Sequence, residues 1–181
     1  AVDTAEGEKL FKADRIFINT GATPFVPPVE GLTIGGAIHT SETIMNLEEY
    51  PESLVIIGSG FIGLEFAATY AQFGTKVTVV DVIDTFLPRE DEDVAQAVKE
   101  QLEALGVTFN LGVQLKAVHQ EGGKAVVEAT TGEGAPVAFT ADAVLVATGR
   151  RANVQGLDLD KAGVELTERG AIKVNEFLQT N

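Results

Sequence analysis

The chain contains the pattern GxGxxG of a phosphate-binding loop, as Gly58-Ser59-Gly60-Phe61-Ile62-Gly63. In this pattern we expect Gly58 to permit a tight turn, Gly60 to let the backbone approach a pyrophosphate, and Gly63 to let the next helix pack against the preceding strand. Backbone N–H groups at the start of that helix would then bind the anion. The alternative is that the glycines serve only turns and packing.

An acidic residue follows this loop at the spacing that dinucleotide-binding folds use. Asp81 ends an apolar run and lies 18 residues after Gly63, close to the separation of about 20 in such folds. A carboxylate there accepts hydrogen bonds from the 2′- and 3′-hydroxyls of an adenosine ribose and would repel a 2′-phosphate. Because Val82 and Ile83 supply no arginine for such a phosphate, we predict binding of NAD over NADP. A solvated acid at a strand end is the alternative.

Hydrophobic periodicity predicts the elements that must position the loop. Continuous apolar runs predict parallel strands at 54–57, 76–81, 107–109 and 143–147. Helices are expected at 61–73 and from Asp91 to the glycine at 106. Alternating segments predict an antiparallel meander at 113–118, 124–128 and 136–140. This order predicts an α/β fold, with a Rossmann-like parallel sheet whose last crossover is a β-meander.

Three further segments give weaker patterns. Residues 15–19, rich in β-branched and aromatic side chains, predict a strand that stops at Thr20-Gly21. Thr40 or Ser41 is expected to cap a short helix that passes Leu47 and ends before Pro51. In the helix after Asp91, one apolar stripe is predicted, formed by Val94, Val98, Leu102 and Leu105.

Composition excludes several classes of function. The 13 basic and 27 acidic residues give a net charge of −14, so nucleic acid is not an expected partner. There is no cysteine, and the two histidines, His39 and His119, lie far apart, so we expect no metal site and no catalytic residue. No apolar run approaches the roughly 20 residues of a membrane span. We expect a cytoplasmic protein without a membrane partner.

One internal repeat indicates a second nucleotide-binding domain. Residues 13–21 and 141–149 share Ala, Asp, Thr and Gly at matching positions, with β-branched residues at the same inner positions. Each resembles the closing strand of a nucleotide-binding sheet, yet only the second follows a glycine loop. We therefore expect that a further dinucleotide-binding domain precedes this chain in a longer parent. Chance similarity of two apolar strands is the alternative.

Four ordered motifs, at 58–67, 86–91, 147–153 and 169–176, resemble the pyridine nucleotide-disulfide oxidoreductases. The dihydrolipoamide dehydrogenase and mercuric reductase-like branch is most similar, with relatives implicated in defence against reactive chlorine. The resemblance implies that residues 22–150 are an NAD-binding domain, and that 1–21 and 151–181 are parts of an FAD domain. It implies hydride transfer from NADH to FAD, which the parent binds mainly through absent residues, and a homodimeric parent. The fragment alone should not be an active enzyme.

The resemblance also implies roles for single residues. Phe61 corresponds to an aromatic residue that covers the flavin ring, or else is a core residue, and Glu65 corresponds to a glutamate directed toward the nicotinamide amide. Leu115 corresponds to an apolar residue beside the adenine, with core packing as the alternative. Gly149 follows the last parallel strand, at the edge where such sheets bind ligands. Arg150 either contacts phosphate or pairs with surface acids.

Arg89 is expected to be structural and to tie the loop before the acidic helix start.

Two other functions stay open: a stand-alone NAD-binding or redox-sensing module, and a relative of the NADH oxidases or peroxidases.

Overall fold

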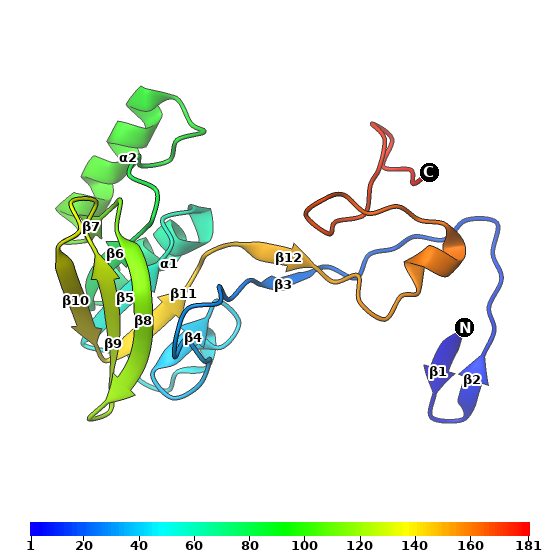
Figure 1. Ribbon diagram of the computed structural model, residues 1–181, viewed down its shortest axis with the longest axis horizontal. Helices are drawn as coiled ribbons and strands as arrows, with labels where there is room; N and C mark the ends of the chain where they lie inside the picture. Colours follow the sequence, from blue (N-terminus) through cyan, green and yellow to red (C-terminus); the bar gives the residue numbers. More distant parts are fainter. The chain divides into compact units, whose positions relative to one another are not determined.

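A computed structural model describes residues 1–181, except for the side chain of Asp3. The chain divides into two compact units (Figure 1). The larger unit is Thr23–Arg151, and the smaller unit combines Ala1–Ala22 with Ala152–Asn181. The boundaries predicted from the sequence lie one residue before each of these divisions.

The larger unit is built on a five-stranded sheet in which all neighbouring strands are parallel. In spatial order its strands are β4 (Ile38–Thr40), β11 (Ala143–Val146), β5 (Ser53–Ile57), β6 (Lys76–Val80) and β7 (Thr108–Asn110). The three central strands are almost wholly apolar because both faces of the sheet are covered. The edge strand β4 is an addition to the predicted sheet.

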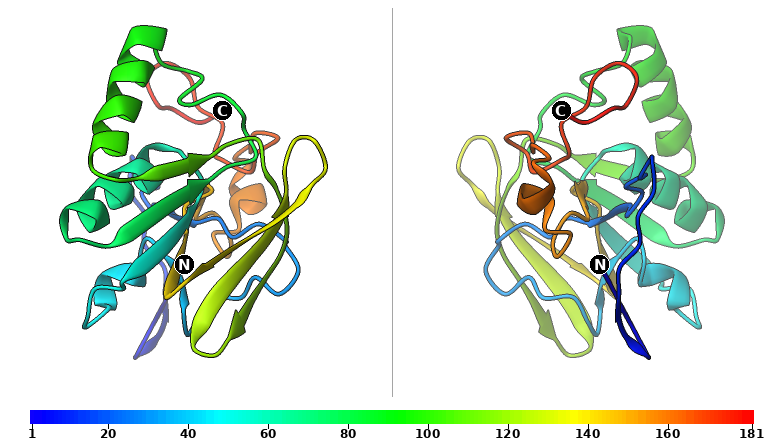
Figure 2. Two further views of the ribbon diagram at one scale, coloured as in Figure 1. Left: turned by 90° about the vertical axis from the view of Figure 1, so that its left-hand side faces the viewer. Right: turned by 90° about the vertical axis from the view of Figure 1, so that its right-hand side faces the viewer.

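The two faces of the sheet are covered by different structures (Figure 2). Helices α1 (Phe61–Gln72) and α2 (Glu92–Ala104) pack on one face, where Ile56 of β5 shares a core with Leu64 of α1. The other face packs against the antiparallel strands β8 (Gln114–Glu121), β9 (Lys124–Thr130) and β10 (Pro136–Ala141), where Val55 meets Val127. The side chains of β5 therefore alternate between two cores, as the period of a strand requires. The predicted fold class and β-meander crossover are confirmed.

The helix boundaries agree closely with the prediction, but the buried face of α2 differs from the predicted apolar stripe. Gly74 and Gly106 follow the two helices with φ of +92° and +88°, the left-handed conformation that ends helices. Asp91 occupies the N-cap of α2 without a side-chain cap hydrogen bond. The predicted stripe is wrong at its ends, since Val94 and Leu105 are exposed, and the buried face instead contains Ala95 and Leu102.

The predicted helix near Thr40 is reduced to one short turn. Ile44–Asn46 forms a 3-10 helix, η1, which ends at Leu47. Residues just before it belong to β4, because Ile38 and its neighbours pair with β11. The two-stranded sheet of β3 (Ala22–Pro24) and β12 (Arg150–Ala152) was not predicted.

The smaller unit contains little regular structure. It has an antiparallel pair, β1 (Val2–Thr4) with β2 (Gly7–Lys9), and a 3-10 helix, η2 (Leu159–Ala162). The predicted strand at 15–19 is wrong: these residues adopt no strand, and Phe17 is 88% exposed. A strand needs a hydrogen-bonding neighbour, and no strand in the described chain pairs with this segment. Among the helices described in either unit, none has the length and apolar character needed to cross a bilayer.

Candidate functional site

A cavity of about 850 Å³ lies at the carboxyl edge of the parallel sheet. Ile57, Val80 and Ala147, at or just after the ends of β5, β6 and β11, all line it. The connections diverge here, because β5 continues through α1 to β6 on one side while β11 pairs with β5 on the other. Such a switch point at the carboxyl ends of the strands is where open α/β sheets bind their ligands.

The glycine loop runs along this cavity, and its three positions are occupied by glycine for different reasons. Gly58 has φ +109°, and a Cβ there would come within 2.5 Å of the Ala147 carbonyl oxygen. A Cβ on Gly63 would come within 2.1 Å of the Gly58 carbonyl oxygen. A larger residue at either position would therefore strain the backbone and destabilise the fold, in agreement with the predicted tight turn and close helix packing.

Gly60 is glycine for a different reason. Its φ and ψ of −74° and 174° are open to any L-amino acid, and a Cβ there would meet nothing within 4 Å. Neither backbone conformation nor packing within the chain requires a glycine at this position. Gly60 also lines the cavity at the N-terminus of α1. The missing side chain leaves the backbone open to a ligand, and the N-terminal end of a helix favours an anionic one.

Asp81 is hydrogen-bonded to the glycine loop, a contact that was not predicted. Its Oδ2 accepts hydrogen bonds from the backbone N–H of Ser59, at 2.6 Å, and from the Ser59 hydroxyl, at 2.7 Å. Its Oδ1 accepts the N–H of Ile83 at 2.9 Å. The carboxylate is half-buried and lines the cavity. The signal that could have revealed this contact is the hydroxyl residue inside the loop, two positions after the end of β5.

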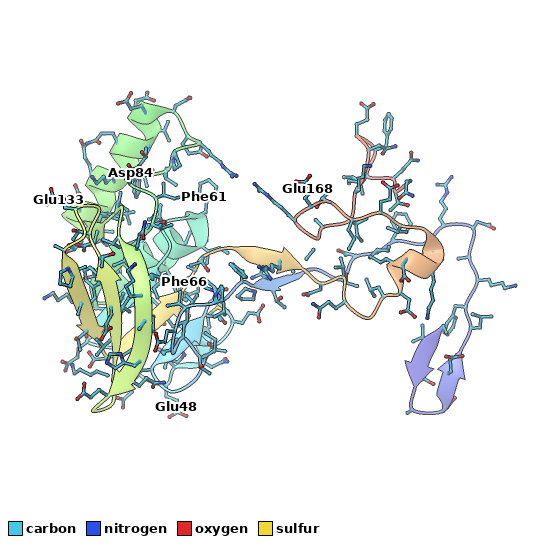
Figure 3. All side chains as sticks on the ribbon, in the orientation of Figure 1. Glu48, Phe61, Phe66, Asp84, Glu133 and Glu168 are labelled. Carbon is cyan, nitrogen blue, oxygen red and sulfur yellow. The ribbon has the colours of Figure 1, made fainter. Side chains whose placement is uncertain are left out.

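The structure gathers most of the predicted cofactor residues around the cavity. The residues that line it are Gly58, Gly60, Phe61, Ile62, Asp81, Leu115 and Gly149. Two predicted residues are buried and do not line the cavity: Ser59, inside the loop, and Gly63, in the first turn of α1. Glu65 is exposed on the same helix and does not line the cavity. Phe61 is 65% exposed at the start of α1, which does not fit the alternative that it is a core residue (Figure 3).

Arg89 lies in a different setting from the one expected. Its side chain is exposed and lines the cavity, and it pairs with no acidic side chain that the structure describes. The expectation that it ties the loop before α2 is therefore wrong. Its place after β6, on the carboxyl edge of the sheet, is the signal that could have assigned it to the site.

Other residues also line the cavity, among them Arg150, which is predicted either to contact phosphate or to pair with surface acids. Arg150 lines the cavity and forms an ion pair with Glu42, with 3.6 Å between Nη2 and Oε1. Thr148 is held by its hydroxyl, which donates to the Phe25 carbonyl oxygen at 2.8 Å. The remaining lining residues are mostly apolar, namely Pro27, Val29, Val82, Ile83 and Gln114. Apolar walls with two guanidinium groups and one carboxylate suit a ligand with both aromatic and anionic parts.

The strongest charge cluster lies at the opposite edge of the sheet. Asp142 accepts hydrogen bonds from Lys124 at 2.8 Å, and from the Ser53 hydroxyl and N–H at 2.6 Å and 2.9 Å. The bond from Lys124 and then the bond from the Ser53 hydroxyl lower the pKa of Asp142 to about 2. Because Ser53 begins β5 and Asp142 directly precedes β11, this cluster fastens the amino edge of the sheet. It is structural and lies outside the cavity.

No group of side chains in the described chain has the arrangement of a metal centre. No set of three or more His, Asp or Glu residues converges among the described residues. His39 lies in β4, and burial lowers its pKa. His119 lies 3.9 Å from Glu128 on the meander. Neither histidine lines the cavity.

Comparisons with known proteins agree with this architecture. The family model described as pyridine nucleotide-disulphide oxidoreductase matches residues 1–181. The chain is 38% identical over 179 residues to the probable pyridine nucleotide-disulfide oxidoreductase RclA of Escherichia coli, covering 99% of this chain and 40% of that protein. It is 36% identical over 180 residues to a dihydrolipoyl dehydrogenase of Bacillus subtilis, covering 99% of this chain and 38% of that protein.

A solved structure has the same fold. The HOCl-induced flavoprotein disulfide reductase RclA from Escherichia coli superimposes with a TM-score of 0.84 at 36% identity, over 93% of this chain and 38% of that one. The chain thus spans about two fifths of the proteins it matches. The match over all residues, together with the parallel sheet, the meander and the glycine loop, shows that the chain belongs to the pyridine nucleotide-disulphide oxidoreductase family.

Proposed function

We propose that the unit Thr23–Arg151 binds NAD(H) in the cavity at the carboxyl edge of its sheet and positions NADH for hydride transfer to a flavin. The observation that supports this most directly is Gly60. It is a glycine that the fold does not require, at the start of a helix, facing a cavity of about 850 Å³. The approach of a pyrophosphate to the loop backbone would explain why this position has no side chain.

The residues around the cavity fit the parts of the dinucleotide. The N-terminus of α1 and the guanidinium of Arg89 offer positive charge to the pyrophosphate. Asp81 offers a carboxylate to the adenosine ribose and disfavours a 2′-phosphate, which supports NAD over NADP. Leu115 and Val29 supply apolar surface for the adenine. In this proposal Phe61, exposed at the cavity, takes the place beside the nicotinamide end.

The proposal extends to the longer parent protein. Nicotinamide supplies a hydride and a flavin accepts it, so the protein has only to bind and orient the two. We propose that the smaller unit contributes to an FAD-binding domain, as the family resemblance implies, and that the parent is a homodimeric enzyme. The solved relative that is named a flavoprotein disulfide reductase supports a disulfide as the class of final electron acceptor.

Calorimetric titration of the chain with NADH, NADPH and FAD tests the proposal. We expect saturable binding of one NADH, weaker binding of NADPH and little uptake of FAD. Asp81→Ala should weaken NADH binding and narrow the difference between NADH and NADPH, because the variant no longer repels a 2′-phosphate. NADPH binding equal to or tighter than NADH binding in the unaltered chain would overturn the NAD assignment.

A further inference from the structure

The hydrogen bonds of Asp81 limit what its carboxylate can accept from a ligand. An ionised carboxylate has about four acceptor positions, two on each oxygen. On Oδ2 both positions are taken, by the N–H of Ser59 at 2.6 Å and the hydroxyl of Ser59 at 2.7 Å. On Oδ1 one position is taken, by the N–H of Ile83 at 2.9 Å. One acceptor position therefore remains for a ligand, and it lies on Oδ1.

The hydroxyl of Ser59 fills the second acceptor position on Oδ2 of Asp81. The two backbone N–H groups already hold one carboxylate oxygen each, so they fix the group without help from a side chain. The hydroxyl of Ser59 adds a third donor and fills the last position on Oδ2. Ser59 is only 6% exposed, and the structure gives its hydroxyl no other acceptor in the described chain. Turning the hydroxyl away would leave a buried polar group unpaired, which is costly.

From this arrangement, and given the proposed NAD(H) binding, we infer that Ser59 makes Asp81 accept only one of the two hydroxyls of the adenosine ribose, through Oδ1. Ser59 is then a positioning residue that determines how the ribose is recognised, although it does not line the cavity. Without Ser59 the carboxylate would be free to accept both hydroxyls.

Binding of two deoxy analogues tests this inference. We would titrate the chain with NAD⁺ and with its analogues that lack the adenosine 2′- or the 3′-hydroxyl. One analogue should bind about tenfold or more weakly than NAD⁺, the loss expected for one hydrogen bond to a charged acceptor. The other should differ by less than about twofold, since its missing hydroxyl has no acceptor position on Asp81. Equal losses for both analogues, or no loss for either, would overturn the inference.

The variant Ser59→Ala gives the second half of the test. It opens the second position on Oδ2, so both analogues should now bind less tightly than NAD⁺, each by about fivefold or more. Ser59→Gly removes the same hydroxyl and replaces Ser59→Ala if that variant does not fold. If Ser59→Ala still binds only one of the two analogues more weakly than NAD⁺, as the unaltered chain should, then Ser59 does not determine how many ribose hydroxyls Asp81 accepts.

A matched control separates this effect from the loss of any buried hydroxyl. Thr75 is buried like Ser59, and its hydroxyl donates to the Pro51 carbonyl oxygen at 2.8 Å, just before β6 at the amino edge of the sheet. Thr75→Val should keep the one-sided pattern. If NAD⁺ does not bind to the unaltered chain, the proposed function fails and this inference fails with it. NAD⁺ binding with equal losses for both analogues would refute the inference alone.

Discussion

The carbonyl oxygen of Gly58 lies so close to the Cα of Gly63 that a Cβ on Gly63 would come within 2.1 Å of it. A second neighbour, Cγ2 of Ile56, would lie at 3.3 Å. The loop therefore folds back directly onto the first turn of α1. This contact, and not only ligand binding, fixes the third glycine of the motif.

Gly63→Ala should destabilise the protein. The added methyl group overlaps backbone that cannot move aside, and we expect a loss of about 1–3 kcal/mol in the free energy of unfolding. Urea denaturation followed by circular dichroism measures it. Gly132→Ala is the matched control, because a Cβ there meets its nearest neighbour at 3.8 Å, an ordinary contact. Equal stability of the two variants would contradict the close approach of Gly63 to Gly58.

Asp142 should make the protein's stability depend on pH in acid. Its pKa of about 2 in the folded chain lies below the ordinary value of 3.8, so its contribution is present above pH 3.8 and is lost as the pH falls through 2. Asp142→Asn removes this contribution. Between pH 4 and pH 2, the unaltered chain should lose more free energy of unfolding than the variant does, as urea denaturation at each pH would show. Parallel losses would mean that Lys124 and Ser53 do not stabilise the ionised carboxylate.

Arg89→Gln should weaken NADH binding several-fold at low salt. The guanidinium lines the cavity without an acidic partner in the described chain, so its charge is available to a phosphate. The effect should shrink as salt is raised, because screening weakens the attraction. Calorimetry at two salt concentrations measures it, with Lys76→Gln as the charge-matched control on the opposite edge of the sheet. No change in affinity at low salt would remove Arg89 from the site.

Phe61→Ala should leave stability nearly unchanged. The ring is 65% exposed, and we expect the free energy of unfolding to stay within about 0.5 kcal/mol of the unaltered value. Phe109→Ala is the contrast, since that ring packs against Phe86 with 5.2 Å between centroids and against the core on the helix-covered face of the sheet. Its loss should cost about 3 kcal/mol. A comparable loss for Phe61→Ala would restore the core interpretation of this residue.

Much of the larger unit could be predicted because its signals are local. The apolar run of β5, the glycine loop and the spacing to Asp81 follow each other along the chain, and the structure keeps that order. The contacts that were missed join residues far apart. The pairing of β4 with β11 brings together Ile38 and Val144, and nothing near Ile38 in the sequence indicates it.

The site residues that were missed have the same physical origin. Arg89 reaches the cavity only because the loop after β6 runs along the carboxyl edge of the sheet. The bond between Ser59 and Asp81 depends on β5 and β6 being neighbours in register, which a pattern of residue types does not specify. For residues 15–19, the local strand preference was strong but no neighbouring strand in the described chain satisfies it.

The measurement that tests the account most directly is a calorimetric titration of the chain and of Gly60→Ala with NADH. Ala is a poorer N-cap than Gly, so the variant should lose at most about 1 kcal/mol of stability and stay folded. Its methyl group would occupy the space through which a pyrophosphate approaches the loop. We predict saturable NADH binding by the unaltered chain and an affinity more than about tenfold lower for the folded variant. Equal affinities in the two proteins, or no binding by the unaltered chain, would contradict the assignment of this loop to the dinucleotide.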